Sequence, residues 1–235
     1  MRRFFWDGAS DGGFAVLTGS EARHLREVLR ISVGHEVILC DGAGRDFSAV
    51  TEQIGRDCVR FRLSGEITEN SEPKLNVTLF LAHTKGDRLD FAVQKAVEIG
   101  ASAVKLFRGE RCIALTGDGK LARLNRIAFE ASKQCGRSRL VRVEDAGTMS
   151  DALRSGDALK LFCCEWETAP IRGKLSPLPA DVSVMCGPEG GFTQEEADAA
   201  REAGWVSVSL GKRILRAETA PIAALTVLLY ENHDI

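Results

Sequence analysis

The sequence lacks several features that would assign it to a common functional class. None of its seven cysteines forms a Cys-x-x-Cys pair and its four histidines are scattered, so a zinc site is not expected. The longest apolar stretch, 220–230, is much shorter than the roughly 20 residues that span a bilayer. Asp7 and Gly8 interrupt the start before a signal-peptide region can develop. We therefore expect a cytoplasmic protein with reduced cysteines, no membrane segment and no metal.

The glycine-rich strings that usually bind nucleotide phosphates are also missing. Neither Gly-x-Gly-x-x-Gly nor a Walker loop occurs in the chain. The net charge of -2 argues against a protein that coats nucleic acid through charge alone. Residues 105–142 nevertheless carry ten basic side chains against three acidic ones. Either a solvated helix face or an RNA-binding surface would explain this local excess.

The hydrophobic pattern changes near residue 70. The preceding part predicts short strands at 14–17, 35–40, 45–50 and 58–63, whose alternation is typical of half-buried strands. Residues 68–74 are polar, contain a proline and predict a linker. Beyond them, strands alternate with helices, which indicates a mostly parallel sheet covered on both faces. We therefore predict an α/β protein with a small β-barrel at 1–70 and an α/β domain at 74–235.

One helix interrupts the predicted barrel and begins with Ser20 as its N-cap. Helical spacing gives it an apolar face of Ala22, Leu25, Val28 and Leu29, and a basic face of Arg23, Arg26 and Arg30. Guanidinium groups match the geometry of phosphate oxygens, so the basic face could bind an RNA backbone. Simple solvation of the arginines is the alternative.

Two glycine-containing turns each follow a predicted strand, where ligands usually bind in open α/β sheets. The first, 186–191, holds three glycines around a proline and a glutamate. Such a loop lets the main chain approach a ligand closely, although glycine and proline are also typical of an ordinary structural turn. Thr193 and Glu196, just beyond it, have the spacing of a capping box for the next helix.

The second turn, 210–221, leads from a strand into the predicted helix 222–230. Pro221 is compatible with the first helical turn, where no intrahelical N–H partner is needed. The helix is apolar on nearly every face. We therefore expect it to be covered all round, either by its own core or by a second subunit.

Together the two turns carry a resemblance to a known family. Gly187-Pro188-Glu189-Gly190-Gly191, followed about twenty residues later by Leu210-Gly211-x-Arg213-Ile214-Leu215-Arg216-x-Glu218-Thr219-Ala220, resembles the paired signature of the small-subunit ribosomal RNA uridine-N3 methyltransferases. Further strings resemble other motifs of that family: His24-Leu25-x-x-Val28-Leu29-Arg30, Gln94-Lys95-x-x-Glu98-x-Gly100, Glu110-Arg111-Cys112 and Gln134-Cys135-Gly136-Arg137. The likeness spans nearly the whole chain.

The resemblance implies a SPOUT-class fold, with a C-terminal trefoil knot in 74–235 and a PUA-like β-barrel at 1–70. It also implies S-adenosylmethionine as the cofactor, with its adenine held by main-chain groups of the two turns and a third wall after strand 158–163. The implied cofactor-binding residues are Phe162, Cys186, Gly187, Pro188, Glu189, Gly190, Gly191, Leu210, Gly211, Ile214, Leu215 and Thr219.

The implied reaction is methylation of uridine N3 in 16S ribosomal RNA, with either naked RNA or the assembled 30S subunit as substrate. A cation would stabilise the charge that spreads onto the uridine carbonyl oxygens. Arg216 is the first candidate, with a structural link at the helix start as the alternative, and Glu189 is a second, polar or base-like candidate. The expected RNA-binding residues are Arg2, Arg3, Arg23, Arg26, Arg30, Arg111, Arg123, Arg126 and Arg137. A homodimer is expected, in which the barrel of one subunit can serve the knot of the other.

Other functions stay open on the sequence alone. A binding-only RNA module would need no cofactor pocket. An α/β oxidoreductase is disfavoured by the missing nucleotide fingerprints. A methyltransferase for another RNA is the nearest alternative, because the signature identifies the cofactor better than the nucleotide.

Overall fold

The computed structural model describes residues 2–69, 71–112, 118–175 and 177–235. It divides into two compact units, one of Met1–Glu72 with Ser132–Leu140 and one of Pro73–Ala131 with Val141–Ile235. Residues 1 and 70, which bound the first predicted domain, lie outside the described residues. Ser132–Leu140 clusters with the first unit although it lies far beyond the predicted linker at 68–74.

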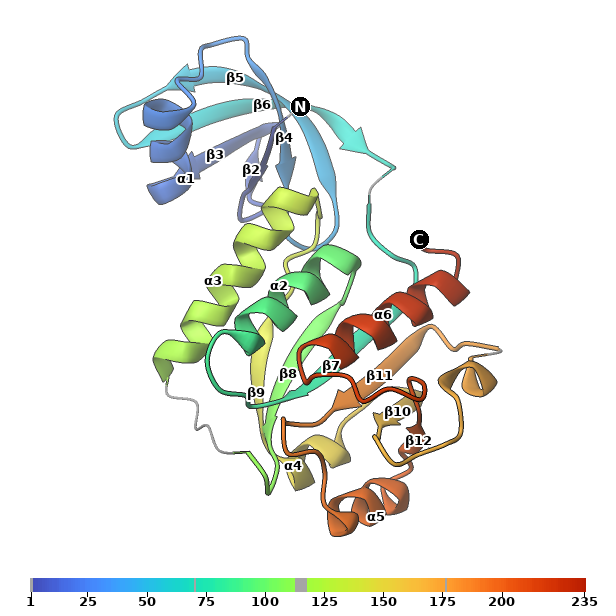
Figure 1. The fold of residues 1–235 in the computed structure, drawn as a ribbon. Coiled ribbons are helices and arrows are strands. Elements are labelled where there is room, and N and C mark those ends of the chain that lie inside the picture. The colour runs from blue at the N-terminus through green and yellow to red at the C-terminus, as the bar shows by residue number, and fades with distance from the viewer. Residues whose placement is uncertain (1, 70, 113–117, 176) are drawn as a thin grey trace. The chain divides into compact units, whose positions relative to one another are not determined.

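The first unit is built on a six-stranded sheet in the order β1-β4-β5-β6-β3-β2, which curls into a half-barrel (Figure 1). The four strands expected from the sequence are present as β3, β4, β5 and β6. Two register shifts in the β5–β6 pair add twist and help the sheet to curl. The strands are β1 (Arg3–Phe5), β2 (Ser10–Asp11), β3 (Phe14–Thr18), β4 (Glu36–Cys40), β5 (Asp46–Ile54) and β6 (Cys58–Ile67).

The helix of the first unit differs from the expected one. It begins as α1 (Gly19–Arg23) after an N-cap at Thr18, so Ser20 is not the cap, and continues as a π-helical turn, His24–Val28. The i→i+5 bond from Leu29 N to His24 O changes the angular spacing of the side chains. Ala22 and Leu25 are buried as expected, whereas Val28 is 66% exposed. The predicted apolar face is therefore wrong at Val28.

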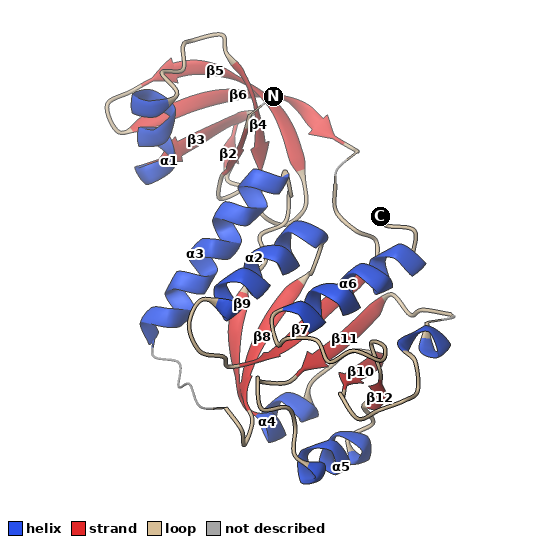
Figure 2. Ribbon diagram, viewed as in Figure 1, coloured by secondary structure: helices blue, strands red, loops and turns tan. Residues whose placement is uncertain are grey.

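The second unit contains a six-stranded sheet in the order β12-β10-β11-β7-β8-β9, in which every pair is parallel (Figure 2). Five of its strands match the strands that the sequence predicts at 75–82, 103–107, 158–163, 182–186 and 205–210. The exception is β9, whose mostly polar sequence gives little apolar alternation. The strands are β7 (Asn76–Ala82), β8 (Ala103–Arg108), β9 (Val143–Thr148), β10 (Leu159–Cys163), β11 (Asp181–Cys186) and β12 (Val206–Val208).

Helices cover both faces of this parallel sheet, as predicted. On one face α6 (Thr219–Glu231) packs on α2 (Arg88–Ile99) and on β7 and β11. On the other, α4 (Met149–Arg154) and α5 (Gln194–Glu202) enclose a core that contains Phe80, Phe162 and Trp205. The long helix α3 (Asp118–Cys135) and a short 3-10 helix (Ile171–Lys174) complete the elements. Within the described ranges, no helix is long and apolar enough to cross a membrane.

Apolar residues at helical spacing predict a helix at 87–99, and all five of them are buried on the inner face of α2: Leu89, Ala92, Val93, Ala96 and Val97. The helix ends at Gly100, whose φ of 132° lies outside the range that other residues adopt easily. In contrast, α6 is not covered all round in the monomer. Val227 and Tyr230 are 37% and 68% exposed, which leaves an apolar stripe on its outer face.

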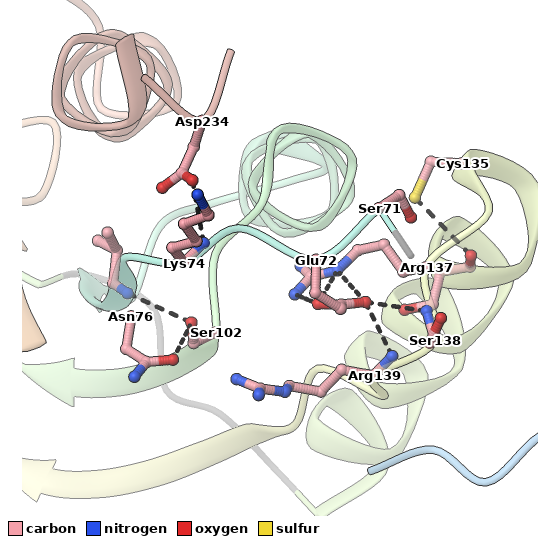
Figure 3. A network of polar contacts seen from close by, with 12 residues as sticks. Ser71, Glu72, Lys74, Asn76, Ser102, Cys135, Arg137, Ser138, Arg139 and Asp234 are labelled. Carbon is pink, nitrogen blue, oxygen red and sulfur yellow. Dashed lines mark hydrogen bonds and ion pairs between the residues drawn. The ribbon is translucent and has the colours of Figure 1, made fainter. Parts of the chain in front are cut away.

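A buried carboxylate organises the segment that follows α3 (Figure 3). Glu72 accepts a 2.7 Å bond from Arg137 Nη2 and bonds from the main-chain N–H groups of Ser138 and Arg139. The side chains of Glu72 and Arg137 are only 9% and 4% exposed. Burial alone would raise the pKa of Glu72, but Arg137 and the N–H donors hold it below the ordinary value of 4.5. This network joins the two stretches of the first unit.

We predict that Glu72→Gln destabilises the protein by about 3 kcal/mol at neutral pH, because Arg137 would stay buried without its counter-ion. The lowered pKa of Glu72 gives stability that is fully present above pH 4.5 and is lost as the pH falls through the folded-state pKa. The stability difference between wild type and variant should therefore shrink in acid. Urea unfolding as a function of pH measures this.

The control is Asp198→Asn, which removes a half-exposed ion pair with Arg201 and should cost less than about 0.5 kcal/mol. Equal losses for the two variants would show that the Glu72 pair contributes no more than a surface contact.

Candidate active site

The ends of three neighbouring strands meet at one edge of the parallel sheet. Cys163, the last residue of β10, aligns with Cys186 at the end of β11 and with Val208 at the end of β12. The chain that follows each strand contributes to the wall of a cavity of about 400 Å³. The lining residues are Cys163, Cys164 and Glu165 after β10; Gly187, Pro188, Glu189, Gly191 and Phe192 after β11; Val208 to Leu210, Gly211, Arg213 to Glu218 and Ala220 after β12; and Arg88 of α2.

The first glycine turn needs two of its glycines for steric reasons. A Cβ atom on Gly187 would lie 2.9 Å from the ring of Phe192, and one on Gly191 would lie 2.5 Å from Glu165 Oε1. Gly191 also has a φ of 68°, and its N–H donates to Pro188 O over 3.0 Å to close the turn. The main chain therefore forms this part of the cavity wall.

Packing and capping hold the same turn in place. The Phe192 ring lies 4.2 Å from that of Phe162 and is stacked on Phe107. The expected capping box is present at the start of α5: Thr193 Oγ1 accepts from Glu196 N, and Thr193 N donates to Glu196 Oε2. Glu196 Oε1 also accepts a 2.8 Å bond from Glu110 N. These contacts preorganise the turn.

The second turn is attached to the chain that follows β10. Ser209 N donates to Ala169 O, and Ile171 N donates to Ser209 O, over 2.8 and 3.1 Å. Cys164 N donates to Val208 O at the strand end. Most of the segment 209–218 lines the cavity, and the chain then enters α6. All three walls expected for the ligand pocket thus surround one space.

Glu189 forms the tightest ion pair of the cavity wall. Its Oε1 accepts a 2.7 Å hydrogen bond from Arg88 Nη1 and a 3.2 Å hydrogen bond from Lys85 N. Partial burial alone would raise the pKa of Glu189, but main-chain N–H donors, including that of Lys85, and the Arg88 guanidinium hold it below the ordinary value. A lowered pKa makes Glu189 a weak base near neutral pH.

Arg216 and Glu218 lie at the entrance to α6. The Arg216 side chain is 81% exposed, and its Nη1 is 4.0 Å from Glu218 Oε1. The guanidinium is therefore loosely held at the rim and can reach a molecule that enters the cavity. Glu218, at 15% exposure, lies deeper in the wall.

Two thiols at the cavity have raised pKa values: Cys164 on its wall and Cys186 behind that wall. Burial raises the pKa of Cys164, and both a hydrogen bond with Cys163 and burial raise the pKa of Cys186. Thiolates are the forms that bind metals and attack substrates, so these cysteines act as small apolar groups. In the part of the chain that the structure describes, no group of three or more His, Cys, Asp or Glu side chains could hold a metal ion.

The structure brings most of the predicted cofactor-binding residues together. Those on the cavity wall are Gly187, Pro188, Glu189, Gly191, Leu210, Gly211, Ile214 and Leu215. Four others are not on the wall. Phe162 and Cys186 are buried behind it, while Gly190 and Thr219 are exposed. Phe162 supports Phe192 and does not face the cavity.

Four charged wall residues were not predicted from the sequence as cofactor or catalytic residues: Arg88, Glu165, Arg213 and Glu218. Arg88 follows β7, and Glu165 follows β10, so both stand just beyond a strand end, which is a signal that could have identified them. Glu218 lies inside the second motif itself. Nothing in its spacing distinguishes a residue that faces the cavity from one that only starts the helix.

The predicted RNA-binding arginines of the first unit fall into two groups. Arg2, Arg23 and Arg30 are exposed and Arg26 is half-buried. In contrast, Arg3 is bonded to the buried Asp46, and Arg137 is 3% exposed and bonded to Glu72. The structure therefore gives Arg3 and Arg137 internal partners, and Arg137 has almost no surface to offer to RNA.

In the second unit, Arg111, Arg123 and Arg126 are exposed. Arg111 Nη1 donates to Gly190 O over 2.8 Å, next to the first glycine turn. Arg123 is bonded to Asp87 and Asp90, which partly neutralise it. Arg111 is thus the one of the three that touches a glycine turn of the cavity.

Comparisons with known proteins agree with this geometry. The RNA methyltransferase domain family matches residues 70–229, and the RNA methyltransferase PUA domain family matches residues 17–64. Proteins named ribosomal RNA small subunit methyltransferase E are similar to this chain over most of its length. The one from Bacillus subtilis is 30% identical over 92% of this chain and 90% of its own, and the one from Synechocystis is 34% identical over 89% and 71%.

Solved structures are similar over the whole chain. A crystal structure of ribosomal RNA small subunit methyltransferase E from Neisseria gonorrhoeae, bound to S-adenosyl methionine, has a TM-score of 0.89 at 34% identity and covers 98% of this chain and 97% of that one. A Legionella pneumophila protein in complex with the bound cofactor has a TM-score of 0.85 at 30% identity and covers 97% and 96%. The chain therefore belongs to the RNA methyltransferase family that includes the proteins named ribosomal RNA small subunit methyltransferase E.

Proposed function

We propose that this protein uses S-adenosylmethionine to methylate N3 of a uridine in the 16S ribosomal RNA of the small subunit. The observation that carries the proposal is the cavity at the ends of β10, β11 and β12, which both glycine turns line. Family membership and the names of the relatives support the RNA substrate. Such a protein works in the cytoplasm, where ribosomal subunits are found.

The two parts of the chain have different roles. Residues 1–70 form the PUA-like RNA-binding domain, in agreement with the PUA match at 17–64. Residues 74–235 form the SPOUT methyltransferase domain, whose C-terminal trefoil knot contains the two glycine turns. Arg2, Arg23, Arg26 and Arg30 contact the RNA backbone from the first domain, and Arg111 and Arg126 do so from the second.

The cavity fits the cofactor. Its volume of about 400 Å³ lies in the range of small-molecule sites. The glycine turns offer main-chain N–H and C=O groups to an adenine edge, and the close packing against Phe192 and Glu165 leaves no room for side chains at Gly187 and Gly191. Bound S-adenosylmethionine supplies a methyl group on a cationic sulfur, which is a good leaving group.

Charged residues of the chain act on the nucleotide. Uridine N3 becomes nucleophilic as its proton passes to solvent water, and negative charge then spreads onto the flanking carbonyl oxygens. Arg216, loosely held at the rim, stabilises that charge. The low pKa of Glu189 argues against a role as the base, and we assign to Glu189 the orientation of Arg88 at the cavity wall.

Replacement of Arg216 by alanine should lower the single-turnover methylation rate by about 100-fold or more, the usual effect of removing one preorganised donor. The Kd for S-adenosylmethionine, measured by calorimetry, should change little. The control is Lys212→Ala, which removes a neighbouring exposed cation that does not line the cavity. An unchanged rate in the Arg216 variant would leave Arg216 with a structural role only.

The modified nucleotide itself can be mapped. Incubation with methyl-labelled cofactor and either 30S subunits or naked 16S RNA, followed by nucleoside analysis, should give N3-methyluridine. Comparison of the two substrates shows whether the assembled subunit is recognised. Label in another base, or only in transfer RNA, would refute the substrate assignment.

The outer face of α6 supports a homodimer. Val227 and Tyr230 are exposed on a helix that is otherwise apolar, and a second copy of the chain can cover them. In such a dimer the RNA-binding domain of one subunit can serve the knot of the other.

We predict that Val227→Glu converts a dimer into a monomer, because the charge would be buried without a partner. Analytical ultracentrifugation measures the mass. Val16→Glu, at a similarly exposed apolar position of the first unit, is the control and should remain dimeric. A monomeric wild type at micromolar concentration would rule out the dimer.

A further inference from the structure

Glu218 occupies an unusual place in the cavity wall. It is the N-cap residue of α6, yet its side chain makes no capping hydrogen bond. The side chain is 15% exposed, in contrast to 81% for Arg216 two residues earlier. It borders both the main cavity and a small second cavity that reaches Thr84 and Ala92. Its carboxylate is therefore directed inward, away from bulk solvent.

This carboxylate is incompletely paired. Oε2 is buried, and no described residue places a hydrogen-bond partner within reach of it. Oε1 has only the 4.0 Å contact with the exposed guanidinium of Arg216, which is too long for a hydrogen bond. The other two glutamates of the wall differ, because Glu189 is bonded to Arg88 and Glu165 is exposed.

A largely buried carboxylate without a full set of partners lowers the stability of the folded protein unless a cation pairs with it. The positive end of the α6 dipole offsets part of this cost. Within the described residues, none of the three arginines of the cavity wall supplies the missing cation. Arg88 is bonded to Glu189, Arg216 is held only loosely, and Arg213 forms no ion pair with Glu218. The ligand of the cavity is the remaining source.

We infer that Glu218 is the counter-ion of the sulfonium group of S-adenosylmethionine. A sulfonium has no N–H to donate and is weakly hydrated, so a buried carboxylate can attract it at a small desolvation cost. The ammonium group of the same ligand is strongly hydrated and is better satisfied by water. Because the demethylated ligand has a neutral sulfur, Glu218 makes the pocket prefer the methylated form and favours release of the spent one.

The inference rests on the cofactor assignment but not on the choice of nucleotide, and ligand binding tests it without RNA. We would measure by calorimetry the Kd of three ligands for wild type and Glu218→Gln. S-adenosylmethionine has a positive sulfur, S-adenosylhomocysteine a neutral one, and in sinefungin an ammonium-bearing carbon replaces the methylated sulfur.

We expect the variant to bind S-adenosylmethionine and sinefungin roughly tenfold more weakly, because one partly screened charge pair is lost. The Kd of S-adenosylhomocysteine should not change. Glu231→Gln, an exposed glutamate at the far end of the same helix, is the matched control and should change none of the three.

Equal weakening for all three ligands would overturn the inference, because all three share the ammonium and the adenosine. Unchanged binding would overturn it as well. If Glu218→Gln fails to fold in thermal unfolding, Glu218→Asp keeps the charge and should keep the preference for the positive ligands. A wild-type protein that binds none of them would overturn the cofactor assignment together with this inference, whereas a wrong methylated base would leave the inference intact.

Discussion

Parallel strand pairing in register is the constraint on which the active site depends. Because Cys163 aligns with both Cys186 and Val208, three strands end at the same level of the sheet. Main-chain groups inside the sheet are used by the ladders, whereas the turns beyond the strand ends lie outside the ladders. Main-chain atoms can therefore bind a ligand at this edge of the sheet. The site requires glycine because glycine lets the main chain approach the ligand closely.

The charges around the cavity differ in how firmly they are held. Arg88 and Glu189 form a close pair that stiffens the wall, Arg216 stands almost free at the rim, and Glu218 lies deeper with an unsatisfied oxygen. Each charge can therefore have a separate role. The Arg88–Glu189 pair shapes the pocket, and Arg216 can follow an incoming nucleotide. Glu218 can respond to the charge of the bound methyl donor. A cavity that selected its ligand by shape alone would not distinguish the methyl donor from its demethylated product.

Sequence reasoning succeeded where a local pattern determines structure. The α2 face, the capping box at Thr193 and strands β3 to β8 follow from periodicity and from residues close in the chain. It failed at β9, where pairing with β8 overrides a polar sequence, and at Val28, where a π-turn rotates the side chain outward. Phe162 could have been placed correctly, because strand alternation directs it away from Cys163. The inward position of Glu218 depends on tertiary contacts and has no local signature.

The half-barrel unit is assembled from two stretches of the chain, with Glu72 from the first holding Arg137 and the main chain of the second. This discontinuity bears on how such proteins can evolve by domain shuffling. If the N-terminal module alone were exchanged, residues 132–140 would lose Glu72. The buried guanidinium of Arg137 would then have no acceptor. A viable recombination must carry both stretches, or replace Arg137 at the same time, so the two modules are expected to be inherited together.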